Sequence, residues 1–290
     1  MMIFKKFVLF LLGGLMMFAA EAQQMARNND QPADLYNENS VRPVRKDDIM
    51  FKKTLWFRVD MRQKANAPFF ATDKEITGLL IDAVKAGIIT PYADDNLDKK
   101  LSEADFLERL KVPTMNDLDQ MGDDDEGTWD NDDDWGDAGG EETASELAAD
   151  MPVEFFPKQL YVMEIKEDYL FDRRESRAKH DVQVLTIIIP ADQNPLGLDK
   201  ELASFSYREL AEKLFKNNPD AIWFNPQNSA ASLNLSEAFD LRLYNGMLVK
   251  YEHPKNSSIV ELYGGGKRAL QASQEAVYKL LEYEALLWEY

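Results

Sequence analysis

The acidic residues between 121 and 142 are the first candidates for chemistry. Asp130, Asp132, Asp134 and Glu141 occupy the first, third, fifth and twelfth places of an EF-hand calcium loop. The sixth place needs a glycine for its sharp turn, and this chain has Trp135 there. These four residues are therefore weak calcium candidates. The interpretation we favour is a solvated, self-repelling linker.

Hydrolytic chemistry has few residues to use. The chain has no cysteine, so a cysteine nucleophile is excluded. A Ser-His pair would need His180 or His253, which are its two histidines. Both are expected in loops, one in a charged turn and one before Pro254. The glycines before Lys267 in "YGGGKRAL" lack the spacing of a phosphate-binding loop. We therefore predict no catalytic, metal or cofactor residues.

A charged connection between two predicted strands is a candidate for protein contacts. It includes Asp172, Arg173, Arg174 and Arg177. One interpretation is an exposed turn, and the other is a binding edge whose arginines match carboxylates of a partner. Near the end of the chain, Tyr283, Trp288 and Tyr290 are either core residues or interface anchors. The core is favoured for Trp288, whereas Tyr283 and Tyr290 remain contact candidates.

The distribution of charge limits the classes of partner. The net charge is −19, yet residues 117–150 hold 15 acidic residues and no basic ones. Outside that run and residues 1–22, the chain has 31 basic and 36 acidic residues, so the net charge of the body is only −5. Nucleic acid is not expected as a partner, because it requires a basic surface.

The first 22 residues resemble a secretory signal peptide. A short basic start is followed by an apolar run from Phe7 to Ala20 and by Ala20-Glu21-Ala22, which fits a cleavage site. The apolar run is too short to span a bilayer, which needs about 20 residues. No cysteine follows it for lipid attachment. We expect an exported protein without a lipid anchor of its own.

Hydrophobic periodicity predicts an α+β fold, with a mixed sheet flanked by helices and a long disordered acidic insertion. Strands are expected in "TLWFRVDM", "GIIT", "KQLYVMEIKED", "HDVQVLTIIIPA", "AIWF", "MLVKY" and "SIVELY". Capping boxes at Thr72, Ser102 and Ser206 predict three helices. A final helix is expected from Lys267 to Tyr290, with Leu270, Val277, Leu280, Leu281, Leu287 and Trp288 on one broad face.

These elements suggest a division of the chain into five segments. Residues 1–22 form the signal peptide and residues 23–47 an extended leader. Residues 48–112 form the first part of the α+β domain and residues 153–290 the second, with the acidic disordered linker over 113–152. We expect the first part to pack onto the second instead of folding alone.

Several long segments resemble one known family. They include "MFKKTLWFRVDMRQKANAPFF", "ITGLLIDAVKAGIITPY", "PVEFFPKQLYVMEIKEDYLFDRRESR", "ELAEKLFKNNPDAIWFNPQN", "EAFDLRLYNGMLVKYEHPKN" and "LLEYEALLWEY". They closely resemble the GldN/PorN family of the Bacteroidetes, from about residue 40 to 290. The leader and the acidic run fall outside the resemblance.

The resemblance implies a periplasmic component of the type IX secretion system, which in gliding species supports motility. It implies assembly with the outer-membrane lipoprotein GldK into a ring of repeated subunits, near a GldM-like motor component. It implies a scaffold without catalytic residues or cofactors, and localisation at the outer membrane through partners. The alternatives are an exported hydrolase or a calcium-dependent binding module.

Overall fold

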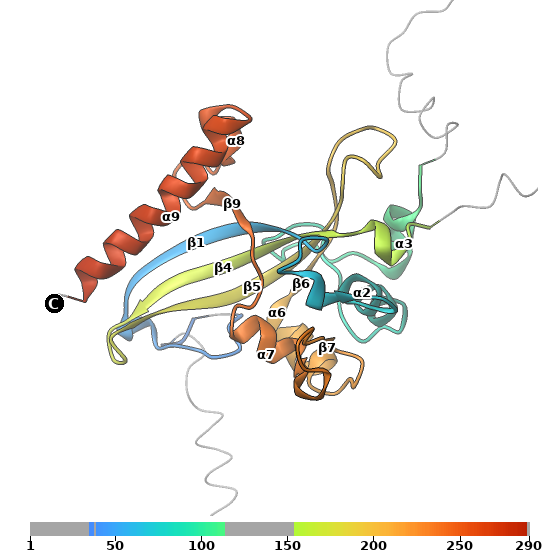
Figure 1. Ribbon diagram of the computed structural model, residues 1–290, viewed down its shortest axis with the longest axis horizontal. Helices are drawn as coiled ribbons and strands as arrows, with labels where there is room; N and C mark the ends of the chain where they lie inside the picture. Colours follow the sequence, from blue (N-terminus) through green and yellow to red (C-terminus); the bar gives the residue numbers. More distant parts are fainter. Residues whose placement is uncertain (1–34, 38, 114–153, 289–290) are drawn as a thin grey trace, which may run out of the picture.

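The fold is built on one five-stranded sheet whose neighbours all pair antiparallel. The computed structural model describes residues 35–37, 39–113 and 154–288. Along the sheet the order is β6-β5-β4-β1-β9 (Figure 1). The bounds are β1 Ile49–Asp60, β4 Val162–Asp172, β5 Arg177–Ile189, β6 Lys200–Ser206 and β9 Met247–Tyr251. The predicted α+β class is confirmed, although the sheet expected to be mixed is antiparallel throughout its described pairs.

The two central strands form a hairpin. β4 and β5 pair from Val162 with Ile188 to Asp172 with Arg177, and a four-residue turn joins them. This short connection makes the pair antiparallel, because a parallel pair needs a crossover of a dozen or more residues. In β1, Leu55, Phe57 and Val59 are buried in the two apolar clusters, and Trp56, on the other face of the strand, is buried as well. Two small sheets pair β2 (Phe70–Ala71) with β3 (Lys74–Glu75) and β7 (Ile222–Trp223) with β8 (Leu233–Asn234).

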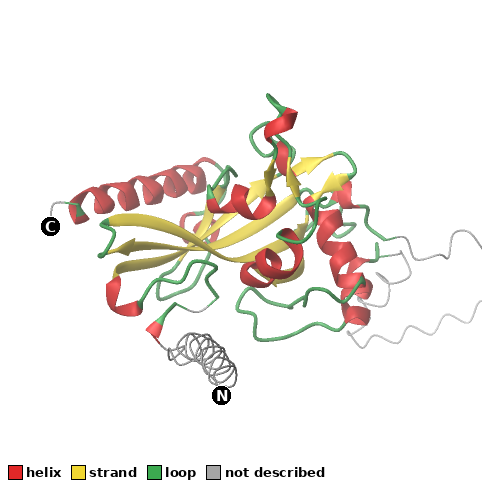
Figure 2. Cartoon of the chain, turned by 90° about the horizontal axis from the view of Figure 1, so that it is seen from below, coloured by secondary structure: helices red, strands yellow, loops and turns green. Residues whose placement is uncertain are grey.

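Helices lie on both sides of the sheet. In Figure 1, α6 (Tyr207–Glu209) and α7 (Leu235–Asp240) lie below β5, while α8 (Ile259–Tyr263) and α9 (Lys267–Leu287) lie above β1. α2 (Ile76–Lys85) and α3 (Glu103–Leu110) lie at the end of the sheet that is away from the β4–β5 turn. A π-helical segment continues α6 from Leu210 to Phe215. Figure 2 shows α9 running along the sheet with its far end beyond the strands.

The largest apolar cluster joins the segments on the two sides of the acidic run. From residues 48–112 it includes Val59, Leu80 and Phe106, and from residues 153–290 it includes Leu185 and Phe205. A second, smaller cluster lies under α9 and contains buried Leu55, Phe57, Tyr169, Leu248, Ile259 and Ala269. The polar site described below lies between these two apolar clusters.

Three local predictions are wrong for identifiable reasons. "GIIT" forms no strand, because Gly87 (φ +67°) ends α2 and the N–H of Ile88 bonds back to the carbonyl of Ala83. Thr72 does not cap α2, because Lys74–Glu75 pair as β3 and the helix begins at Ile76. "SIVELY" is helix α8, started by a capping box between Ser258 and Glu261.

The broad face predicted for the final helix is divided in the structure. Val277 and Leu280 pack against the small cluster, whereas Leu270, Leu281 and Trp288 are exposed. The expected core position of Trp288 is therefore wrong, since 58% of its surface is exposed. No described helix has both the length and the apolar character needed to cross a membrane. Residues 1–22, the acidic run and Tyr290 lie outside the described residues.

Candidate functional site

A carboxylate on the core side of the sheet is the centre of the polar site. Glu167 lies in β4 between Ile165 and Tyr169, and none of its surface is exposed. The Arg242 guanidinium donates from Nη2 to its Oε1 at 3.0 Å and from Nε to both oxygens at 3.3 Å. His180 Nδ1 lies 2.8 Å from Oε1, and the Tyr244 hydroxyl donates to Oε2. We call these four residues the Glu167 cluster.

The electrostatics of the Glu167 cluster favour a permanently charged carboxylate. Burial alone would raise the pKa of Glu167, but the hydrogen bond with His180 and the charge of Arg242 lower it to about 2. Tyr244 shows the opposite effect, because burial and the neighbouring carboxylate raise the pKa of its hydroxyl well above the ordinary value. A carboxylate with so low a pKa is a poor general base near neutral pH. The arrangement suits a structural ion pair better than proton transfer.

The two histidines do not form a hydrolytic pair in the described part of the chain. His180 hydrogen-bonds to Glu167, and no described serine bonds to its ring. Both ring nitrogens of His253 are buried, and no described residue gives them a hydrogen-bond partner. Its ring instead packs 5.4 Å from that of Tyr251. The Ser-His geometry required of a hydrolase is absent around both histidines among these residues.

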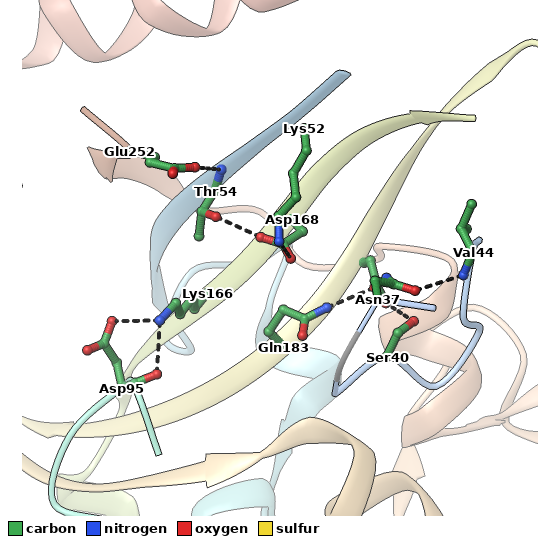
Figure 3. Close-up of polar contacts among 11 residues, drawn as sticks. Asn37, Ser40, Val44, Lys52, Thr54, Asp95, Lys166, Asp168, Gln183 and Glu252 are labelled. Atoms are coloured by element: carbon green, nitrogen blue, oxygen red, sulfur yellow. Dashed lines mark hydrogen bonds and ion pairs between the residues drawn. The ribbon is translucent and has the colours of Figure 1, made fainter. Parts of the chain in front are cut away.

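The leader is held against β5 by polar contacts. Asn37 Nδ2 donates to Asp181 Oδ2 at 2.7 Å, and Ser40 Oγ donates to Oδ1 at 2.8 Å. Gln183 adds a third donor to the same carboxylate at 2.8 Å, and Figure 3 shows it beside Asn37 and Ser40. Burial raises the pKa of Asp181 to about 6, and the nearby carboxylate of Asp168 adds to this. The described residues of the predicted leader thus lie on the body of the protein.

Half of β5 has a free edge. β6 pairs only with Val184–Ile189, so the stretch from Arg177 to Val182 has no strand beside it on that side among the described residues. A cavity of about 530 Å³ lies there, between the leader and this stretch. It is lined by both His180 and Asp181, which are consecutive and therefore point to opposite faces of the sheet. A cavity that reaches both faces of one strand lies at its edge.

The predicted contact residues of the β4–β5 turn differ in exposure. Arg173, Arg174 and Arg177 are exposed, and Arg177 pairs with Glu175 at 2.8 Å. Asp172 is buried, where its carboxylate accepts hydrogen bonds from the N–H groups of Arg174 and Glu175 and from Lys179. Burial opposes these bonds, yet they lower its pKa below the ordinary value. Asp172 therefore organises the turn, and the arginines project from it.

The remaining predicted residues are elsewhere. Tyr283 is 43% exposed, and its ring lies 4.7 Å from that of Phe51. Tyr290 and the weak calcium candidates Asp130, Asp132, Asp134 and Glu141 lie outside the described residues. Within the described ranges, no group of three or more carboxylates or histidines is arranged to hold a metal ion.

The Glu167 cluster is the feature that the sequence analysis missed. The predicted strand "KQLYVMEIKED" contains Glu167, but no role was assigned to this residue, which the structure buries completely. Strand periodicity contained a usable signal, because Ile165, Glu167 and Tyr169 share one face and the first is fully buried. Arg242, 75 positions away in sequence, had no comparable signal.

One comparison with known proteins is informative about the family. The family model described as "Gliding motility associated protein GldN" matches residues 44–289, which include the Glu167 cluster and helix α9. The search of curated proteins found no match. A match over most of the chain shows the family, and the family resemblance noted in the sequence is thereby confirmed. The chain belongs to the GldN/PorN family of the gliding motility and type IX secretion machinery.

Proposed function

We propose that this protein is a non-enzymatic structural component of the type IX secretion apparatus in the periplasm. In this proposal it assembles with a GldK-like outer-membrane lipoprotein into a ring of repeated copies, near a GldM-like motor component. Membrane contact is then made only through partners. Family membership supports the machinery, and the free edge of β5 supports a role in assembly.

The free edge of β5 is the observation that carries the proposal. An unpaired strand offers a row of N–H and C=O groups, and an extended segment of another chain binds such an edge by adding a strand. The adjacent cavity of about 530 Å³ provides room for side chains of that segment. Exposed Arg173, Arg174 and Arg177 at the start of the edge match acidic groups on a partner.

The Glu167 cluster fits this proposal as a support for the edge. His180 of the cluster lies in the part of β5 that has the free edge, and its hydrogen bond with Glu167 links it to β4. A strand held in this way presents its edge in one fixed register, which reduces the ordering cost of binding. A general base must accept a proton near neutral pH. Glu167 is unsuited to that role, because its pKa is lowered to about 2.

Co-purification with the lipoprotein tests the proposal. We expect the wild-type chain to be retained by an immobilised GldK-like lipoprotein, and the double variant R174E/R177E to lose most of this retention. Arg208→Glu is the matched control, because Arg208 is exposed on α6, pairs with Glu212 and does not line the cavity beside the edge. Retention of the double variant equal to that of the control would refute docking at the edge. No retention of the wild type would refute assembly with the lipoprotein.

A further inference from the structure

The helix α9 has more exposed apolar surface than its packing on the sheet explains. Leu270, Tyr278, Leu281 and Trp288 expose between 46% and 70% of their surfaces. They follow one another at helical spacing, together with exposed Gln274 and Ala285. We call these six residues the outer stripe. An exposed apolar surface of this kind marks an interaction site.

The outer stripe is separate from the face of α9 that packs on the body. Ala269, Ala276 and Leu280 face Leu55 and Phe57 of the small cluster. On a helical wheel with 100° per residue, the stripe is centred roughly 100–130° from that inner face. Figure 1 shows the sheet on only one side of α9, and Figure 2 agrees. Of its four large side chains, Trp288 alone has a ring contact with the described part of the body, edge to face with Phe171 at 6.2 Å between ring centroids, and it still exposes 58% of its surface.

The outer stripe is nearly symmetric about the middle of the helix. Position 270 mirrors 288, 274 mirrors 285 and 278 mirrors 281, all about a point near residue 279. Two antiparallel copies of α9 would therefore place Leu270 against Trp288 and Tyr278 against Leu281. Both contacts occur twice, as a twofold contact between identical surfaces requires.

The charges of α9 also fit an antiparallel neighbour. Lys267 and Arg268 lie in the first turn, and among the described residues neither has an ion pair. Lys279 pairs with Glu275. The second half carries exposed Glu282, and also Glu284, which lies on the body side and accepts the Tyr169 hydroxyl. This is the reverse of what the helix dipole favours, because cations are destabilised at the N-terminus and anions at the C-terminus. An antiparallel copy brings the acidic half of one helix next to the basic end of the other.

From these observations we infer that the outer stripe of α9 pairs with the α9 of a second copy of this chain, antiparallel and about a twofold axis. The inference deepens the self-association contained in the proposed function. It concerns a different surface from the edge of β5, and it needs no lipoprotein. A ring made of such pairs would have the dimer as its repeating unit, because a twofold contact closes on itself.

The size of the outer stripe predicts a moderate affinity. Large apolar side chains bury about 150–250 Å² when fully covered, so four that are roughly half exposed offer about 400 Å² per copy. With its polar rim, the pair reaches the lower end of specific protein interfaces, at about 1,200 Å² in total. We therefore expect a dimer that dissociates in the micromolar range.

Sedimentation equilibrium of the purified chain, without any partner, tests the pairing. We expect a monomer–dimer equilibrium over about 1–100 μM, the range in which a contact of this size dissociates. Leu281→Glu should weaken dimerisation at least about tenfold, since it places a carboxylate at the centre of the stripe. Leu286→Glu is the matched control, because Leu286 is 52% exposed on another face of the same helix. It should leave the dissociation constant within about twofold.

Three results would overturn the inference. One is a wild-type chain that remains monomeric throughout the range, and another is an equal effect of the two glutamate variants. The third is a monomer in which Leu281→Glu abolishes binding of the lipoprotein, which would assign the stripe to that partner. Circular dichroism checks that both variants fold, and Leu270→Glu provides a second disruption of the stripe should Leu281→Glu unfold.

Disulfide trapping determines the direction of the pair. The chain has no cysteine of its own, so single cysteines can be introduced at positions 274 and 285. After the Gln274→Cys and Ala285→Cys chains are mixed and oxidised, antiparallel pairing predicts mainly mixed dimers between the two variants. Dimers formed mainly within each variant would indicate a parallel pair and contradict the proposal.

Discussion

Substitution of Glu167 by glutamine tests whether the buried cluster stabilises the fold. Glutamine has nearly the same shape, but it removes the negative charge and directs an NH₂ group towards the donors Arg242, His180 or Tyr244. Arg242 is then left near the core without its counter-charge. Removal of one partner from a buried ion pair costs about 3–5 kcal/mol of unfolding free energy.

The lowered pKa of Glu167 gives a similar magnitude. It falls from 4.5 to about 2 in the folded protein, which corresponds to a free energy on the order of 3 kcal/mol at roughly 1.4 kcal/mol per pKa unit. Because the folded pKa is depressed, this stability is present above about pH 4.5 and is lost as the pH falls towards 2. The substitution should therefore destabilise the protein strongly at pH 7 and progressively less below pH 4.5.

Thermal and urea unfolding at pH 7 and pH 3.5 measure this effect, as a thermal midpoint and an unfolding free energy. At pH 7 we expect the thermal midpoint of Glu167→Gln to fall by about 6–20 °C, given about 2–4 °C per kcal/mol for a domain of this size. Glu284→Gln is the control, because this half-buried carboxylate also accepts a tyrosine hydroxyl, that of Tyr169 at 2.5 Å. It should cost under about 1 kcal/mol. A loss for Glu167→Gln no larger than the control, or one that grows towards pH 3.5, would refute the reasoning.

Three further substitutions probe other parts of the fold. Burial raises the pKa of Glu164 from 4.5 to about 7, so its ionisation costs stability, which is lost as the pH rises from 4.5 to about 7 and stays lost above it; Glu164→Gln should therefore stabilise the protein by about 1–3 kcal/mol at pH 8 but not at pH 4.5 in urea titrations. A Cβ at Gly246 would lie 2.9 Å from Val59 Cγ2, so Gly246→Ala should lower the thermal midpoint while Gly265→Ala, with open space, should not. Buried Asn66 makes three hydrogen bonds to backbone groups of Asp60 and Asn245, so Asn66→Ala should cost about 2–4 kcal/mol and accelerate hydrogen exchange at the N–H of residue 245.

The long elements could be predicted from sequence because each one has a clear pattern. The second half of β1 alternates apolar and polar residues except at Trp56, and Val184–Ile189 of β5 is apolar except at Thr186 and buried throughout, as expected for the centre of a sheet. The capping box at Ser102 also predicts the start of α3 correctly. The strand β6 was missed, because "KELASFS" has neither strict alternation nor a continuous apolar run.

Short elements required information that local periodicity does not contain. α8 has a strand-like composition, yet the capping box of Ser258 and Glu261 satisfies the helix start and decides the conformation. The free edge of β5 could not be predicted either, since it depends on where β6 begins and ends. In general, sequence patterns indicated which residues are buried, but the partners of a buried polar residue depend on tertiary structure.

The register of the central hairpin explains why the polar cluster and the free edge occur together. Lys166 pairs with Val184, but Glu167 pairs with Val182, so Gln183 is an extra residue in β5. This bulge changes which residues of β5 share a face with Glu167, and it directs His180 towards the cluster and Asp181 towards the leader. Without the bulge the two side chains would exchange faces, so that Glu167 would lose a partner and the leader its anchor. The Glu167 cluster therefore fixes the bulged register, and the bulge in turn positions the unpaired edge that we assign to assembly.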